Sequence, residues 1–379
     1  MPAEGESPPR PSGLPPLLGA GPGEADALLL LRCLQGITPL SLHAVVWESG
    51  SASQALRAIR AGRAGSDGDR AFLAGARPDH IRDQLRRAGA RFAPPGHPDY
   101  WPALLRLADP PVAVFVRGLP LELGEDRVAV IGSRRPTSVG RAVAVDLGRG
   151  LAAAGVSVVS GAAVGTDGAA HLGALDAGGR TVAVLGSGID TDYPPRNRDL
   201  LKRIESAGTI VSEYPPGVPP EPHRFPARNR VIAALSRAVV VVEGAEHSGT
   251  RITVEHASEL GLDLYAVPGS VTSPLSETPL GMIRDGARMI RGAADLLEDL
   301  GIRRAPDAPP PRALPQDERR VLETLAERLL PETVAERAGL SASEALAALI
   351  GLELRGLVRC SGGRWERAFV GSTGESRTA

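Results

Sequence analysis

A short run of residues in the second half of the chain combines two arginines, an asparagine and an aromatic ring. It reads Phe225-Pro-Ala-Arg228-Asn229-Arg230, and the apolar run Ala238–Val242 follows soon after it. The pattern predicts a helix that starts near Phe225 and then a strand buried on both faces. Backbone N–H groups at a helix start bind phosphate well together with guanidinium groups. Since Phe225 adds a flat face for a base, the run indicates an anion site, and a nucleic acid is the expected ligand.

Three other loops combine glycine with hydroxyl or charged side chains at an expected helix start. They are Gly132-Ser133-Arg134, the segment Ser160–His171 with Gly161, Gly165 and Asp167, and Ser248-Gly249 with Thr253. Backbone amides and Arg134 could hold phosphate in these loops, but an ordinary turn or helix cap fits the same spacing. The run Gly186-Ser187-Gly188 lacks the third glycine of a dinucleotide-binding loop, and no phosphate-loop lysine is present.

No set of residues with catalytic spacing is found in the sequence. Glu213, Glu243 and Glu255 are acids, but carboxylates at strand ends and on helices are usually solvated or paired. Asp167 and His171 lie one helical turn apart, and two ligands are too few for a metal site. We therefore expect no catalytic residue, no metal site and no cofactor.

From Arg127 onwards the chain alternates apolar strand-like runs with helical stretches, and Gly or Pro follows most of the runs. The expected strands are Val128–Ile131, Val156–Ser160, Thr181–Leu185, Thr209–Ser212, Ala238–Val242 and Leu264–Val267. This alternation is typical of an α/β fold with a doubly wound parallel sheet of the Rossmann-like type. Ligands bind such sheets beyond the carboxyl ends of the strands, so the glycines that follow the strands are site candidates. They are Gly132, Gly161, Gly186, Gly244 and Gly269.

The predicted sheet domain covers residues 96–300 and has two different segments before it. Residues 1–24 are rich in Pro and Gly and predict a disordered tail. Residues 25–95 predict a small domain of short helices, of the helix-hairpin-helix or SAM-like type. Its turn places Thr38 as a helix N-cap with Pro39 directly after it. The segment either contacts DNA itself or serves only as a packing domain.

A Pro-rich linker, residues 301–313, leads to a second small domain at residues 314–370. Three helical stretches and a hairpin there predict a winged helix. Its long helix, Ser341–Arg355, contains Glu344, Glu353 and a single arginine. A DNA-reading helix normally presents Arg, Asn or Gln to base edges. Charge therefore favours contact of this helix with a protein, or packing within its own chain.

Composition excludes several classes of protein. The chain has 379 residues with a formal net charge of −1, so it is not a wholly basic nucleic-acid protein. Residues 96–300 contain 20 basic and 24 acidic side chains, so a nucleic-acid site there must be a local patch. Cys33 and Cys360 are the two cysteines, and no apolar run reaches membrane-spanning length. We expect a cytoplasmic protein without a membrane span.

Taken together, these loops resemble the DprA (Smf) family, the DNA-processing proteins of bacterial transformation. The resemblance covers about residues 95–300, and the helical and winged-helix segments also fit the layout of the family. The matching motifs are His97-Pro98-Asp99-Tyr100-Trp101-Pro102, Gly132-Ser133-Arg134, Ser160–His171, Ala183–Asp190 with Tyr193-Pro194, Ser212–Gly217, Phe225-Pro226 with Arg228-Asn229-Arg230, Ser248-Gly249 with Thr253, and Ala266–Ser270.

The resemblance implies a binding protein and no enzyme. Members of the family bind single-stranded DNA, dimerise, and load the RecA recombinase onto incoming strands past single-strand-binding protein. By this resemblance Arg134, Arg228 and Arg230 would contact phosphates, the loops at Gly132, Gly161 and Ser248 would supply backbone donors, and Phe225 would stack on a base. The DNA-binding residues expected are Gly132, Ser133, Arg134, Ser160, Gly161, Gly165, Asp167, Gly186, Phe225, Arg228, Asn229, Arg230, Ser248, Gly249 and Thr253.

The sequence departs from the family pattern at Val164, at Thr166 and at residues 277–280, which leaves one side of the predicted pocket less polar. Two other functions are also considered. Nucleotide or nucleoside-phosphate hydrolases on a related sheet have a Glu three residues after a Gly-Thr pair, whereas Gly249-Thr250 is followed by Glu255. The other function considered is that of a scaffold that binds a protein partner and no nucleic acid.

Overall fold

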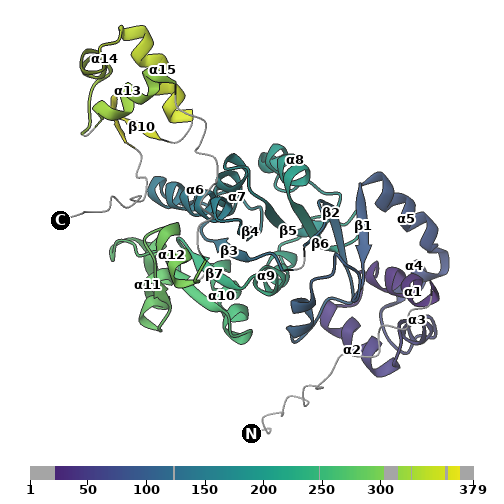
Figure 1. Cartoon of the computed structure of the whole chain (residues 1–379). Helices are drawn as coiled ribbons and strands as arrows, with labels where there is room; N and C mark the ends of the chain where they lie inside the picture. Colours follow the sequence, from purple (N-terminus) through teal and green to yellow (C-terminus); the bar gives the residue numbers. More distant parts are fainter. Residues whose placement is uncertain are drawn as a thin grey trace. The chain divides into compact units, whose positions relative to one another are not determined.

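The structure is a computed structural model that describes residues 22–122, 124–246, 248–302, 315–325, 327–354 and 357–367 (Figure 1). Residues 1–21 of the predicted tail, residues 303–313 of the predicted linker and Arg355 lie outside the described residues. Residues 22–24 were predicted as tail, but the structure has them as the start of helix α1 (Pro22–Arg32). The chain divides into two compact units. The first unit consists of residues 1–127, 182–237 and 252–262, and the second of residues 128–181, 238–251 and 263–379.

The N-terminal segment is helical, as predicted. Its helices are α1 (Pro22–Arg32), α2 (Pro39–Ser49), α3 (Ala52–Arg60), α4 (Asp67–Gly75) and α5 (Pro78–Arg87). The Thr38 side chain caps α2 by accepting from the Ser41 amide at 3.1 Å, which confirms the predicted N-cap. Helices α4 and α5 were not predicted, although Ser66 and Asp69 form a capping box at the start of α4.

Nine strands form a sheet in the order β1-β2-β6-β5-β4-β3-β7-β8-β9. The pairs β5–β6, β3–β7, β7–β8 and β8–β9 are parallel, whereas β1–β2 and β2–β6 are antiparallel. The predicted mostly parallel α/β sheet is thereby confirmed. The strands are β1 (Ala90–Ala93), β2 (Val114–Gly118), β3 (Arg127–Ile131), β4 (Ser157–Ser160), β5 (Thr181–Gly188), β6 (Thr209–Tyr214), β7 (Ala238–Val241), β8 (Asp263–Ala266) and β9 (Arg288–Met289).

All six predicted strands are present, and β1, β2 and β9 were missed. β1 lies inside the segment predicted to be helical, at residues 25–95, yet it pairs with β2. Its four residues, Ala-Arg-Phe-Ala, show no clear alternation, and β9 is only two residues long. Such short edge strands depend on the neighbouring strand for their hydrogen bonds, so their own sequence gives little signal.

Helices follow most strands and cover the sheet. They are α6 (Ser138–Ala153), α7 (Thr166–Asp176), α8 (Arg198–Ala207), α9 (Arg224–Ala234), α10 (Gly249–Glu259), α11 (Glu277–Arg284) and α12 (Ala293–Asp299). Short 3₁₀ turns lie at η1 (Pro102–Arg106), η2 (Pro195–Asn197) and η3 (Pro274–Ser276).

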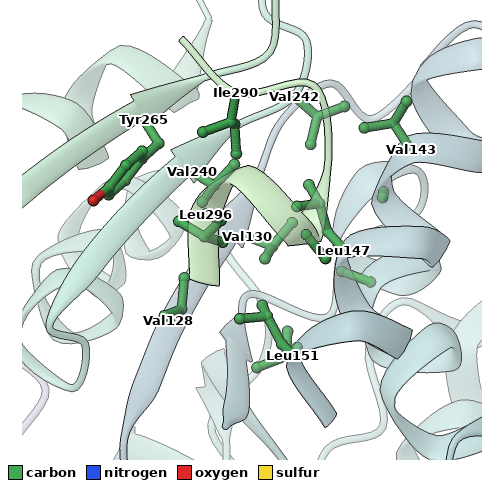
Figure 2. Close-up of a cluster of buried hydrophobic side chains, with 14 of the residues drawn as sticks. Val128, Val130, Val143, Leu147, Leu151, Val240, Val242, Tyr265, Ile290 and Leu296 are labelled. Carbon is green, nitrogen blue, oxygen red and sulfur yellow. The ribbon is translucent and has the colours of Figure 1, made fainter. Parts of the chain in front are cut away.

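The hydrophobic core of the second unit lies between its strands and the helices that pack on them. Figure 2 shows Val128 and Val130 of β3 with Leu147 and Leu151 of α6, all of them buried. Burying one such side chain contributes roughly 1.5–3 kcal/mol. Gly148 of α6 lies against the backbone of α7, where an added Cβ would clash with the Ala170 carbonyl oxygen. Because Gly148 has no side chain, α6 packs against α7 more closely than any larger residue at this position would allow.

The C-terminal domain is the predicted winged helix. It contains α13 (Gln316–Thr324), α14 (Pro331–Ala338), α15 (Ala342–Leu354) and the hairpin of β10 (Val358–Ser361) with β11 (Arg364–Arg367). Its own core includes Val321, Leu349 and Trp365. On α15, Leu346 and Ile350 are 44% and 45% exposed, so the surface of this helix is apolar and acidic rather than basic.

The close contact of α6 with α7 makes a stability prediction. Gly148→Ala puts a methyl group against the Ala170 carbonyl oxygen, so we expect a loss of about 1–3 kcal/mol in unfolding free energy. Gly281→Ala in α11 is the matched control, because nothing lies within 4 Å of its added Cβ. That change should stabilise by about 0.4–1 kcal/mol. Urea unfolding measures both, and a Gly148→Ala protein as stable as the parent would contradict the packing.

Candidate nucleic-acid interface

The predicted arginine helix exists as α9, but it turns its arginines inward. Arg224, Arg228 and Arg230 are 8%, 6% and 3% exposed. A buried guanidinium group requires partners inside the protein, because an unpaired buried charge is strongly destabilising. The structure therefore gives these arginines internal contacts, and the predicted contact of Arg228 and Arg230 with phosphate stays a prediction.

Arg230 is held by two carboxylates of the first unit. Its Nη1 and Nη2 atoms each donate to Glu213 at 2.9 Å, and Nε donates to Asp109 Oδ2 at 2.9 Å. Burial alone would lower the pKa of Arg230, but Glu213 and Asp109 outweigh it and raise the pKa above its ordinary value. Arg230 thus stays charged and links α9 to the carboxyl end of strand β6.

Arg228 joins α9 to β5. Its Nη1 donates to the Val184 carbonyl oxygen, and its Nε donates to Asn229 Oδ1 at 3.3 Å. Asn229 itself is half-buried. The predicted trio Arg228-Asn229-Arg230 therefore fixes the position of the helix in this structure.

Arg224, the first residue of α9, connects this helix to the N-terminal helices. Its Nη2 donates to Gln35 Oε1 at 3.2 Å, and its guanidinium carbon lies 5.1 Å from the centre of the Tyr214 ring. Arg32 of α1 lies over the same ring at 5.4 Å. Arg32 is 4% exposed, and burial lowers its pKa. The helical segment therefore braces the start of α9 through two cation–π contacts on one ring.

Phe225 packs at the carboxyl end of β5 beside a second aromatic ring. The centres of the Phe225 and Tyr193 rings are 5.6 Å apart at an interplanar angle of 32°. A Cβ added at Gly186 would lie 2.8 Å from Phe225 Cδ1, so only glycine leaves room for the ring. Tyr193 is 38% exposed. Sequence reasoning gave Tyr193 no role, although the Tyr193-Pro194 pair was part of the motif pattern.

The Gly132 loop follows β3 in the second unit. A Cβ at Gly132 would lie 2.8 Å from both the Glu243 carbonyl oxygen and Thr166 Oγ1, so the loop lies directly against its neighbours. Ser133 Oγ accepts the Arg135 amide at 3.0 Å. Arg134 and Arg135 are both exposed to solvent. Of the three arginines predicted to contact phosphate, Arg134 is the exposed one.

A carboxylate of the protein lies at the start of α6, after the Gly132 loop. Glu243 accepts the Thr137 amide at 2.9 Å and the Thr137 hydroxyl at 2.6 Å. An added Cβ at Gly140 would run into the same carboxylate. Negative charge is stabilised at a helix N-terminus, so Glu243 takes the position that an anion would otherwise occupy.

The Gly161 loop shows the same arrangement. Asp167 Oδ2 accepts the amides of Gly161 and Ala163 at 3.1 and 3.4 Å. Gly165 has φ +102°, and an added Cβ there would meet the backbone of Ser133 and Arg134. The amides predicted to bind phosphate are therefore engaged by Asp167. Ser160 is fully buried, and its hydroxyl donates to the Val130 carbonyl oxygen at 2.7 Å.

The third predicted loop, Ser248-Gly249, begins α10. Gly249 is exposed, Ser248 is half-buried, and Thr253 is 2% exposed. Thr278 packs on the preceding loop, since its hydroxyl donates to the Ala245 carbonyl oxygen at 2.8 Å and its amide to Gly244 at 3.0 Å. The departure from the family pattern at residues 277–280 therefore lies directly beside a predicted site loop.

Among the residues that the structure describes, no group of three or more His, Cys, Asp or Glu side chains is placed to hold a metal ion. None of the helices built from them is both long and apolar enough to cross a membrane.

The Arg230–Glu213 pair predicts a large effect on stability. Glu213→Ala leaves a buried guanidinium without its main partner, so we expect a loss of about 3–5 kcal/mol in unfolding free energy. Arg237→Ala is the matched control, because it breaks a half-exposed pair with Asp126. There we expect at most about 1 kcal/mol. Urea unfolding compares the two, and equal losses would show that burial of the pair has no special effect.

Comparison with known proteins gives the family. The family model for DNA recombination-mediator protein A matches residues 91–301, more than half of the chain. The model for the DprA winged helix domain matches residues 305–364. A relative from Mycobacterium tuberculosis is 42% identical over 296 residues, which are 75% of this chain and 73% of the relative.

Two solved structures are similar as well. The X-ray structure of DNA processing protein A (DprA) from Streptococcus pneumoniae is 31% identical, has a TM-score of 0.58, and covers 73% of this chain and 97% of its own. A structure of DNA processing protein A from Helicobacter pylori, described for its single-stranded DNA binding mode, is 27% identical. Its TM-score is 0.50, and it covers 56% of this chain and 95% of its own.

These matches agree with the motif resemblance and with the sheet and winged helix that were predicted. They do not support the alternative of a nucleotide hydrolase. The chain belongs to the DprA family of DNA recombination mediators, which are DNA-binding proteins and not enzymes.

Proposed function

We propose that this protein binds single-stranded DNA without strong sequence preference. The observation that supports this most is the Tyr193–Phe225 pair, a partly exposed aromatic surface on a helix that is anchored by buried arginines. Bases of any sequence stack on such rings, because every base has a π-face. The Helicobacter pylori relative, whose single-stranded DNA binding mode has been described, supports the same ligand.

The proposed binding residues fall into three roles. Phe225 stacks on a base with help from Tyr193, and Arg134 contacts phosphate, because it is exposed. Arg228, Asn229 and Arg230 keep α9 in place. The glycine loops shape the backbone, and their members are Gly132, Ser133, Ser160, Gly161, Gly165, Asp167, Gly186, Ser248, Gly249 and Thr253.

The stacking surface makes a testable prediction. Phe225→Ala should weaken binding of oligo-dT by about 1–3 kcal/mol, the usual contribution of one aromatic–base stack. The dependence of affinity on salt should stay as in the parent, since no phosphate contact is lost. Fluorescence anisotropy over a salt series measures both quantities. Unchanged affinity of Phe225→Ala would contradict the stacking role.

Arg134 makes the complementary prediction. Arg134→Ala should make the plot of log affinity against log salt less steep by roughly 0.7, the value for one phosphate contact on a single strand. Arg284→Ala is the control, because Arg284 is an exposed arginine at the end of α11. If both variants bind alike, Arg134 has no specific contact with DNA.

We further propose the partners that the family resemblance implies. The protein acts in the cytoplasm as a homodimer and loads RecA recombinase onto single strands covered by single-strand-binding protein. Light scattering tests the dimer. A strand-exchange assay with RecA and single-strand-binding protein tests loading, and a reaction no faster with the protein than without it would exclude this role.

A further inference from the structure

Three exposed arginines lie close together in the chain at the end of α3. Arg57 and Arg60 belong to the last turn of the helix, and Arg63 follows it. None of the three guanidinium groups forms an ion pair or a hydrogen bond with any residue that the structure describes. We call these three residues the α3 arginine cluster.

The local fold holds the backbone of the cluster in place. One face of α3 is buried, and Arg57 and Arg60 lie outside it, one turn apart. Gly62 then takes φ +74°, and the Arg63 amide donates to the Ala58 carbonyl oxygen at 3.0 Å. This bond closes a Schellman motif, which fixes Arg63 directly after the helix. Three residues of chain separate Arg63 from Arg60, so their Cα atoms are at most about 11 Å apart.

The carboxylates that follow the cluster in the chain are already engaged. Asp67, the first residue of α4, is paired with Arg70. The Arg70 Nη1 atom lies 3.7 Å from the position of a Cβ added at Gly62, so this ion pair lies beside the turn. Asp69 is buried and forms the capping box of α4. The three arginines of the cluster are therefore left as a local excess of positive charge.

This excess charge suits a chain of phosphates. Like charges three residues apart on a helix repel each other, and the dipole at the carboxyl end of α3 offsets only part of the repulsion between Arg57 and Arg60. A phosphate group pairs well with a guanidinium group. Because all three arginines are exposed, they do not enclose a small anion, whereas a polyanion can contact several of them at once.

The neighbouring side chains favour DNA over an anionic membrane as this polyanion. A helix that lies on a membrane presents several large apolar side chains beside its basic ones. Among the described residues of the helical segment, the large apolar side chain that is exposed is Phe72 of α4, at 39%. The residues between Arg60 and the start of α4 are small or polar apart from Arg63 itself.

We propose that the α3 arginine cluster is a second DNA-binding site, which holds phosphates of a single strand without regard to sequence. Within the first unit α3 lies apart from α9, so the cluster is separate from the surface at Tyr193 and Phe225 (Figure 1). The inference rests on the proposed function, binding of single-stranded DNA. The phosphates come either from a strand long enough to reach both sites or from a second strand. Of the two roles expected for the helical segment, DNA contact or packing only, the cluster favours contact.

The experiment compares two double variants of the full chain that lose the same charge. The cluster variant combines Arg57→Ala with Arg60→Ala. The matched control combines Arg82→Ala with Arg86→Ala on α5, because these two arginines are already paired with aspartates. Alanine is a strong helix former, so both helices should persist, and urea unfolding checks that they do. Anisotropy over a salt series uses oligo-dT of about 8 and about 40 nucleotides, one within and one well beyond the site size of a small single-strand binder.

Two results would support the cluster. If one strand reaches both sites, the cluster variant should bind only the long oligonucleotide more weakly, and its salt slope should fall by roughly 1.4, twice the value for one phosphate contact. If a second strand binds, the short oligonucleotide should occupy two sites per chain in the parent and one in the cluster variant. The control should match the parent in either case. A cluster variant with the slope and stoichiometry of the parent, or a control that loses as much, would overturn the proposal.

Failure of the proposed function would look different. A parent that binds neither oligonucleotide refutes that function and the cluster with it, whereas a cluster variant equal to a parent that does bind refutes the cluster alone. Vesicles of phosphatidylserine in phosphatidylcholine test the membrane. Vesicle binding that the cluster variant loses, with DNA binding unchanged, would assign the arginines to lipid headgroups and overturn the DNA site.

Discussion

A guanidinium group inside a protein must be paired, since an isolated buried charge costs several kcal/mol. Arg230 meets this requirement with two bonds to Glu213 and one to Asp109. These partners lie on β6 and in the loop after η1, so Arg230 links α9 to two other segments of the first unit. Arg224 and Arg228 add bonds to Gln35 and to Val184. The aromatic surface at Phe225 depends on all of these contacts, because it stands on the first turn of α9.

The glycine loops obey a related constraint. Two helix starts in the second unit already hold carboxylates of the protein, Glu243 at α6 and Asp167 at the Gly161 loop. Glu243 accepts from the exposed amide and hydroxyl of Thr137, whereas Asp167 accepts from the buried Gly161 amide, which would otherwise lack a partner. The amides of Thr137, Gly161 and Ala163 are therefore engaged within the protein itself.

Positive and negative side chains nearly balance over the whole chain, which has 43 basic and 44 acidic residues. The chain as a whole has a net charge of −1, and five arginines of the sheet domain, Arg117, Arg127, Arg224, Arg228 and Arg230, are buried. The α15 helix of the winged helix contains no basic residue, and its exposed Leu346 and Ile350 lie between two glutamates in the sequence. Its surface suits a protein partner better than the edges of bases.

The sequence by itself determined the elements whose signals are local. The six central strands, the Thr38 cap, the winged helix and the family followed from periodicity, capping and motif order. The short edge strands β1 and β9 did not, because pairing with a neighbour defines them, whereas β2 was missed although its buried apolar run Val114-Phe115-Val116 is a local strand signal. The direction in which Arg228 and Arg230 point was decided only by the tertiary structure, since a helix with two arginines suits phosphate and buried carboxylates equally well. The placement of Tyr193 beside Phe225 likewise depends on segments far apart in the chain meeting in space.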